Sequence, residues 1–141
     1  MIRIVAGELR GRRLAVGPGV RPTTERAREA LFSILGDGVR GARVLDAAAG
    51  SGALGFEALS RGAREVVFVE ADRQVARILE KNASTVGMSD RVRVVEREVA
   101  VFVRVDRPAG FDLVFFDPPW ANPVDTELAG LWSAVARGGT F

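Results

Sequence analysis

A glycine-rich turn flanked by acidic residues carries the strongest chemical signal in the sequence. Gly50, Gly52 and Gly55 fit the pattern G-x-G-x-x-G, and Glu70 lies twenty residues after Gly50. Glycine permits a tight turn and a close approach of ligand to backbone, and a glutamate ending the next strand can accept both hydroxyls of a ribose. These features fit NAD and S-adenosylmethionine (SAM) almost equally, and a turn that is tight only for packing is the alternative. Asp46 favours SAM, because a carboxylate there would repel a pyrophosphate but suits the cationic methionine end of SAM.

The motif Asp117-Pro118-Pro119-Trp120 follows an apolar run and forms a second candidate site. Two prolines cannot donate to a strand ladder, so a strand must end there with its carbonyl groups pointing into a cleft. The Asp117 carboxylate and the Pro118 carbonyl could hold the hydrogens of an exocyclic amine on a nucleobase and favour a pyramidal nitrogen aimed at a methyl donor. Trp120 could stack on the base, a contact worth about 1–3 kcal/mol. The alternative is an aspartate cap and a proline turn beside a core tryptophan.

The inventory of reactive side chains is narrow, since the 141 residues include no Cys, His or Tyr. Disulfides, zinc sites built on Cys or His, Cys nucleophiles and His-based triads are therefore excluded. Catalysis must depend on carboxylates, Arg, a single Lys, small polar side chains and backbone groups. Amine chemistry at Asp117 needs no histidine and fits this inventory, and no metal is expected.

Strands and helices are expected to alternate from residue 43 onward within one domain. The apolar runs predict strands at 43–46, 66–70, 92–95 and 111–117, with a fifth opening at Gly138. Helices are predicted between them, and the last one is expected to bury Leu128, Leu131, Trp132 and Val135. Such alternation builds a parallel α/β sheet with helices on both faces and brings the carboxyl ends of the strands to one edge, where ligands bind.

The N-terminal region has a different pattern and a different charge. Residues 1–16 alternate apolar and polar side chains, which predicts a short β-ribbon, and residues 1–28 hold seven Arg against Glu8 and Glu25. This basic arm, assigned to residues 1–20 ahead of a domain at 21–141, suggests a polyanionic partner. A solvated ribbon is the alternative. The arginines expected to grip phosphates are Arg10, Arg12, Arg13 and Arg21.

The helix that follows the arm is expected to begin at Thr23 or Thr24 and to end at Gly36. Its apolar face is predicted to comprise Ala27, Ala30, Leu31, Ile34 and Leu35. Arg26 and Arg28 are expected to face solvent. Elsewhere, Glu57 is interpreted as a structural hydrogen-bonding residue, and Lys81 and Asn82 as helix surface.

Taken together, the motifs resemble the RsmD family of bacterial 16S rRNA (guanine-N2) methyltransferases, which have a Rossmann-like class I SAM-dependent fold. The matching stretches are RIVAGELRGRRL, RPTTERAREALFSIL, VLDAAAGSGALGFEALSRGA, VFVEAD and LVFFDPPW, in the order of the family. The resemblance implies SAM as methyl donor, the N2 amine of a guanine in 16S rRNA as acceptor, and the small ribosomal subunit as substrate. Class I methyltransferases close the sheet with an antiparallel hairpin, so the C-terminal strands are expected to be missing here.

The resemblance also implies roles for individual residues. It assigns catalysis to Asp117, Pro118, Pro119 and Trp120. It assigns the cofactor to Asp46, Ala48, Gly50, Ser51, Gly52, Leu54, Glu70, Ala71, Asp72, Glu98 and Val99. Thr23 and Thr24 are expected either to reach the cofactor or to cap their helix. Trp120 stands where the family usually has Tyr or Phe, and Ala47-Ala48 replace a bulkier pair.

Several alternatives stay open from the sequence. The same fold could methylate adenine N6 in DNA or RNA, or a protein glutamine. A nicotinamide-dependent oxidoreductase and a non-catalytic RNA-binding module are the other candidates. The N-terminus has no signal-peptide pattern and no run reaches a membrane-spanning length of about 18–20 residues, so a cytoplasmic protein without membrane contact is expected. A monomer is expected as well.

Overall fold

The N-terminal ribbon is present and short. The computed structural model describes residues 1–117 and 125–140, and it describes the side chains of residues 1–117 and 130–135. Strand β1 (Ile2–Arg3) pairs antiparallel with β2 (Arg13–Leu14). Gly7 and Gly11, both with positive φ, lie between the two strands. The predicted β-ribbon is therefore confirmed.

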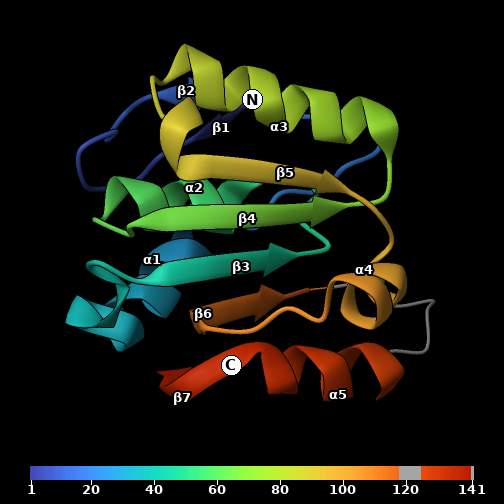
Figure 1. Ribbon diagram of the computed structural model, residues 1–141. Coiled ribbons are helices and arrows are strands. Elements are labelled where there is room, and N and C mark those ends of the chain that lie inside the picture. Colours follow the sequence, from blue (N-terminus) through green and yellow to red (C-terminus); the bar gives the residue numbers. More distant parts are fainter. Residues whose placement is uncertain (118–124, 141) are drawn as a thin grey trace.

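A five-stranded parallel sheet forms the body of the chain, as the alternating pattern predicted (Figure 1). Its spatial order is β5-β4-β3-β6-β7. The strands are β3 (Arg43–Ala47), β4 (Glu65–Glu70), β5 (Val92–Glu96), β6 (Phe111–Phe116) and β7 (Val135–Thr140). The expected fifth strand thus begins at Val135 instead of Gly138.

Helices cover both faces of the sheet. They are α1 (Glu25–Leu35), α2 (Ala53–Ser60), α3 (Arg73–Thr85), α4 (Val99–Asp106) and α5 (Asp125–Ala134), with 3-10 turns at Gly36–Val39 and Ser89–Arg91. One buried cluster joins the ribbon and helices α1, α2 and α3 to the sheet, and a second joins α4 and α5 to its other face (Figure 1). The Rossmann-like arrangement is confirmed, and the ribbon shares the core of the sheet.

The strand register fixes which residues meet at the carboxyl edge. On β3, Ala47 pairs with Val69 of β4 on one side and with Phe116 of β6 on the other. The residues that follow these strands therefore start from neighbouring positions. The glycine turn, Glu70 and Asp117 are brought to the same edge in this way.

Several expectations about packing are wrong. Helix α1 buries Arg28 and Phe32 against the sheet, while Ile34 is 83% exposed. Leu31 and Leu35 of the predicted stripe pack against the core, whereas Ala27 and Ala30 are exposed like Ile34. The buried face is centred instead on Phe32, which packs edge-on against Phe115 of the sheet. Asn82 on α3 is buried, and Trp132 on α5 is 69% exposed.

None of the helices in the described parts of the chain is both long enough and apolar enough to cross a membrane.

Candidate functional site

The glycine turn between β3 and α2 needs left-handed backbone at three positions. Ala48, Gly50 and Gly52 all have positive φ, at 55°, 55° and 74°. At Gly52 a side chain would also collide with Leu79, whose Cδ2 atom lies 2.5 Å from the place a Cβ would occupy. Backbone strain of this kind in a non-glycine residue such as Ala48 is uncommon and is enriched at ligand sites.

Glu70 holds this turn in place from the end of β4. Its Oε1 accepts a hydrogen bond from the Gly50 amide at 2.9 Å, and its Oε2 accepts one from the Asp72 amide at 2.8 Å. The Ala49 amide in addition donates to the Val69 carbonyl at 2.9 Å. A carboxylate oxygen can accept more than one hydrogen bond, so Glu70 keeps acceptor capacity for a ligand beside the turn.

Asp46 lies on β3 beneath the same turn and is 3% exposed. Its Oδ2 accepts a hydrogen bond from the Gly55 amide at 3.0 Å. The pKa of Asp46 is raised to about 8, mainly by burial. The hydrogen bond from the Gly55 amide lowers this pKa, and the nearby carboxylates of Glu70 and Asp117 raise it. A positively charged ligand at this place would stabilise the ionised form of Asp46. Asp46 and the neighbouring carboxylates therefore suit a cationic group such as the methionine end of SAM.

Asp117 is exposed at the end of β6 and borders a cavity of about 440 Å³. The cavity is lined by Thr23, Ala27, Leu31, Leu54, Val114, Phe115, Phe116 and Asp117. It combines an apolar floor with a carboxylate and a hydroxyl at its margin. Small-molecule sites commonly have this character. The other predicted catalytic residues, Pro118, Pro119 and Trp120, lie outside the described residues.

Thr23 and Thr24, which the sequence could not separate, have different surroundings. The Thr24 Oγ1 accepts a hydrogen bond from the Ala27 amide at 3.1 Å and caps α1. Thr23 precedes the cap and lines the cavity. Of the two threonines, Thr23 is therefore the one that lines the cavity.

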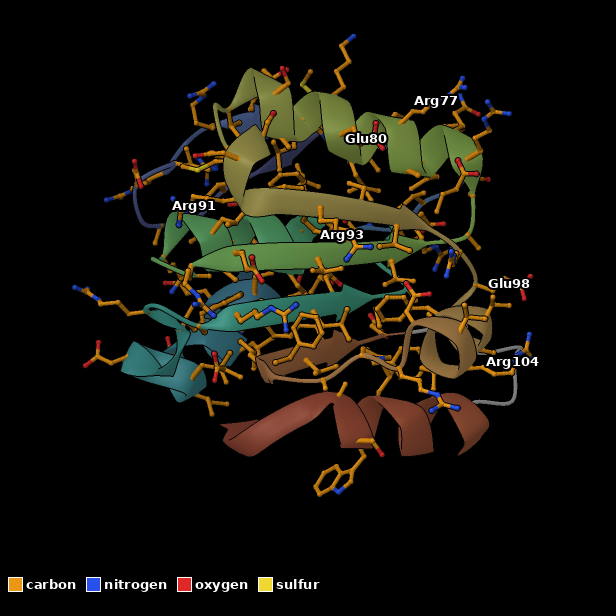
Figure 2. All side chains as sticks on the ribbon, viewed as in Figure 1. Arg77, Glu80, Arg91, Arg93, Glu98 and Arg104 are labelled. Atoms are coloured by element: carbon orange, nitrogen blue, oxygen red, sulfur yellow. The ribbon has the colours of Figure 1, made fainter. Side chains whose placement is uncertain are left out.

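The remaining predicted cofactor residues lie along the carboxyl edge. Ser51 is buried, and its Oγ accepts a hydrogen bond from the Ala53 amide at 3.2 Å. Ala71 is exposed, and Asp72 caps α3. Glu98 occupies the N-cap position of α4 without a side-chain capping bond and points away from the sheet (Figure 2). Val99, the first residue of α4, is half-buried.

The four arginines predicted to bind phosphate are all exposed. Arg12 donates to the Thr85 carbonyl at 3.0 Å, which ties the ribbon to the end of α3. Asn82 on the same helix both donates to and accepts from the backbone of Ala15, at 2.9 and 3.1 Å. The exposed arginines therefore belong to an N-terminal region that is hydrogen bonded to helix α3.

An ion pair that the sequence reasoning missed lies between the ribbon and the site. Arg28, expected to face solvent, is 1% exposed and pairs with the fully buried Glu57 at 2.9 Å. The structural interpretation of Glu57 agrees with this geometry. Arg28 lies one helical turn before Phe32, so recognition of Phe32 as the core residue of the helix would have placed Arg28 on the buried face.

Comparisons with known proteins agree with this architecture. Ribosomal RNA small subunit methyltransferase D of Escherichia coli K12 is 45% identical over 132 residues, which cover 92% of this chain and 66% of that protein. The protein of the same name from Haemophilus influenzae is 43% identical over 123 residues, covering 84% and 64%. A solved structure described as “Putative methyltransferase” from Escherichia coli has a TM-score of 0.86 at 40% identity, covering 96% of this chain and 74% of the other.

The chain spans just under two thirds of the length of these two curated relatives. A family profile described as conserved hypothetical protein 95 matches residues 2–135, nearly the whole chain. The match includes the ribbon, the glycine turn and Asp117. The chain belongs to this family, which is the RsmD family that its sequence motifs resemble.

Proposed function

We propose that the chain is a SAM-dependent methyltransferase acting on the RNA of the small ribosomal subunit. The observation that carries the proposal is the buried carboxylate of Asp46 beside Glu70 and Asp117, a group of acids that suits a cationic ligand. The pyrophosphate of NAD would bring further negative charge to this edge, so the site favours SAM. The names of the two curated relatives support the same reaction class.

Different residues of the carboxyl edge would bind different parts of the cofactor. Glu70 would accept the ribose hydroxyls with the lone pairs left by its two backbone bonds. Asp46 would face the methionine ammonium group, and Thr23 would contribute a hydroxyl from the cavity wall. SAM, when bound, supplies an electrophilic methyl group. The protein contributes orientation and charge, and orientation of this kind can provide much of the rate enhancement.

The methyl acceptor is proposed to be the exocyclic N2 amine of a guanine in 16S rRNA. The base would be flipped out of its stack to reach the cavity beside Asp117. There the Asp117 carboxylate and the Pro118 carbonyl would accept the two amine hydrogens, and Trp120 would stack on the base. Asp117 is also a candidate to take the proton that the amine loses. The proposed partner is the cytoplasmic small ribosomal subunit, whose RNA phosphates the arginines of the ribbon would bind.

Incubation of the purified chain with unmodified small ribosomal subunits and methyl-labelled SAM tests the proposal. Label in 16S rRNA, recovered as N2-methylguanosine after digestion, is the expected result. No incorporation would overturn the methyltransferase proposal, and label on adenine would overturn the guanine-N2 assignment. Calorimetric titration should show binding of S-adenosylhomocysteine, the demethylated product, and none of NAD.

The role of Asp117 is tested by Asp117→Ala. Loss of a group that holds the amine and takes its proton should slow transfer by about 100-fold or more. Affinity for S-adenosylhomocysteine should change by less than about threefold, since Asp117 borders the acceptor cavity. Asp90→Ala, at an exposed aspartate in the 3-10 turn before β5, serves as the control and should retain activity. Equal loss of transfer and cofactor binding in Asp117→Ala would refute the assigned role.

A further inference from the structure

The guanidinium of Arg28 connects the ribbon, which carries the predicted RNA contacts, to the wall of the cavity. Its Nη1 donates to the Arg3 carbonyl of the ribbon at 2.9 Å, and its Nε donates to the Thr23 carbonyl at the cavity wall at 3.3 Å. The same Nη1 pairs with Glu57 at 2.9 Å. One buried side chain thus fixes the spacing between the end of β1 and the wall of the cavity.

Glu57 extends the connection on the ribbon side. Its Oε1 accepts a hydrogen bond from the Val5 amide at 3.0 Å, and its Oε2 accepts one from the Ala6 amide at 3.1 Å. The Arg61 side chain from α2 supplies a second cation at 3.0 Å. The ribbon backbone is therefore held through the Arg28–Glu57 pair as well as by its own strand pairing.

The segment between the ribbon and α1, residues 15–23, runs past the glycine turn and is anchored at both ends. Asn82 holds its first residue, Ala15, by two hydrogen bonds, and Arg28 holds its last residue, Thr23. Between these anchors the Val20 side chain lies over Gly50, 3.5 Å from the place a Cβ would occupy there. The segment that contacts the cofactor turn is thus hydrogen bonded to α3 at one end, and at the other end to the side chain that also holds the Arg3 carbonyl of the ribbon.

We propose that Arg28 is a positioning residue that couples RNA binding on the ribbon to ligand binding at the cavity and glycine turn. The inference rests on the proposed function, because it takes RNA as the ligand of the ribbon and a SAM-type ligand at the turn. RNA that holds the ribbon arginines also holds the Arg3 carbonyl, Arg28 and the Thr23 carbonyl in their joined arrangement. By linkage, each ligand must raise the affinity for the other by the same factor.

A thermodynamic cycle measures this coupling. The affinity of the chain for S-adenosylhomocysteine is determined by calorimetry with and without a saturating transcript of 16S rRNA, and the RNA affinity with and without saturating S-adenosylhomocysteine. The wild-type chain should show a coupling factor of about tenfold, within the usual range for linked sites. Arg28→Met should reduce the factor to about one. Arg28→Lys keeps a charge beside Glu57 but cannot reach both carbonyls with one ammonium, so it should retain only part of the coupling.

Two variants separate coupling from stability. Arg61→Met removes the other cation of Glu57 but touches neither Arg3 nor Thr23, and Glu25→Gln weakens an exposed ribbon contact to Arg3. Both should keep the wild-type coupling factor. Arg28→Met should still fold, because Glu57 keeps Arg61 and two backbone amides as partners. A melting curve for each variant confirms folding.

The outcomes distinguish the two proposals. Failure of the wild-type chain to bind either ligand would overturn the proposed function, and the coupling with it. Binding of both ligands without mutual effect would overturn the coupling alone. A coupling factor that falls as much in Arg61→Met as in Arg28→Met would also overturn the role of Arg28, since loss of the buried network would then suffice.

Discussion

Replacing Asp46 with asparagine should make the protein more stable at alkaline pH. In the folded chain, burial raises the pKa of Asp46 from an ordinary value of 3.8 to about 8, so the carboxyl is protonated there while it is ionised in the unfolded chain. The folded state then binds more protons than the unfolded state, and the free energy of unfolding falls as pH rises through this interval. Asparagine keeps an oxygen for the Gly55 amide and does not ionise.

The size of the effect follows from the pKa difference. Full ionisation of Asp46 costs the folded state on the order of 6 kcal/mol, of which about 4 kcal/mol falls between about pH 5 and about pH 8.5. This is an upper limit, because structural relaxation and water entry reduce the cost of a buried charge. Domains of this size have total stabilities of about 5–15 kcal/mol, so the loss is large.

Urea unfolding of the two proteins across this pH range provides the assay. The wild-type free energy of unfolding should fall relative to Asp46→Asn as pH rises, and the difference between the two should be smallest at the acid end of the range. Asp90→Asn makes the same chemical change on an exposed side chain and should leave the wild-type curve unchanged. Parallel curves for wild type and Asp46→Asn would refute the buried, protonated carboxyl.

Binding of the cofactor supplies a second readout of the same residue. A cationic ligand lowers the pKa of a neighbouring carboxyl, so SAM binding near pH 7 should release a proton from Asp46. Calorimetry in buffers of different ionisation enthalpy measures this release. Asp46→Asn should bind more weakly and release no proton through this residue. Proton release that is the same in both proteins would assign it elsewhere.

Three further predictions concern the turn and the ribbon. Gly52→Ala combines a positive φ with a steric collision and should lower the free energy of unfolding, measured in urea, by more than about 2 kcal/mol. Gly19 also has a positive φ but has open space around it, so Gly19→Ala should lower that free energy by about 1 kcal/mol. Equal losses in the two variants would refute the collision. Asn82→Ala removes two hydrogen bonds to Ala15, the residue after the ribbon, and should cost about 1–3 kcal/mol. Lys81→Ala, at the exposed neighbour, should cost little. Arg13→Gln should weaken RNA binding. The slope of log K against log salt concentration should become shallower by about one, and an unchanged slope would show that Arg13 does not contact a phosphate.

The alternating strands and helices were predictable because they depend on local periodicity and on turn residues. A five-stranded parallel sheet follows from buried apolar runs separated by helices, and its carboxyl edge follows from right-handed crossovers. The structural role of Glu57 was also predictable, because a lone acid within an apolar helix needs partners. These features need no knowledge of contacts between distant parts of the chain.

The buried polar residues were not predictable for the opposite reason. Arg28 is buried because Glu57 and two backbone carbonyls satisfy it, and Glu57 lies 29 residues away. Asn82 is buried because it replaces a strand partner for Ala15, 67 residues away. Side-chain type alone assigns both residues to the surface, since unpaired they would be costly to bury. Only the docked ribbon makes these positions favourable.

Charge provides a second route by which cofactor and RNA influence each other, and it can be separated from the Arg28 contact. Glu70 and Asp117, together with Asp46 once a bound cofactor has ionised it, place negative charge at the edge that the RNA must approach. SAM carries one more positive charge than S-adenosylhomocysteine, so it should offset more of the repulsion between these acids and phosphate. RNA should therefore bind more tightly to the SAM complex than to the S-adenosylhomocysteine complex, and this difference should shrink with added salt. Arg28→Met should preserve the difference while it abolishes the coupling measured with S-adenosylhomocysteine, because the acids remain in place when the ribbon is no longer joined to the cavity wall.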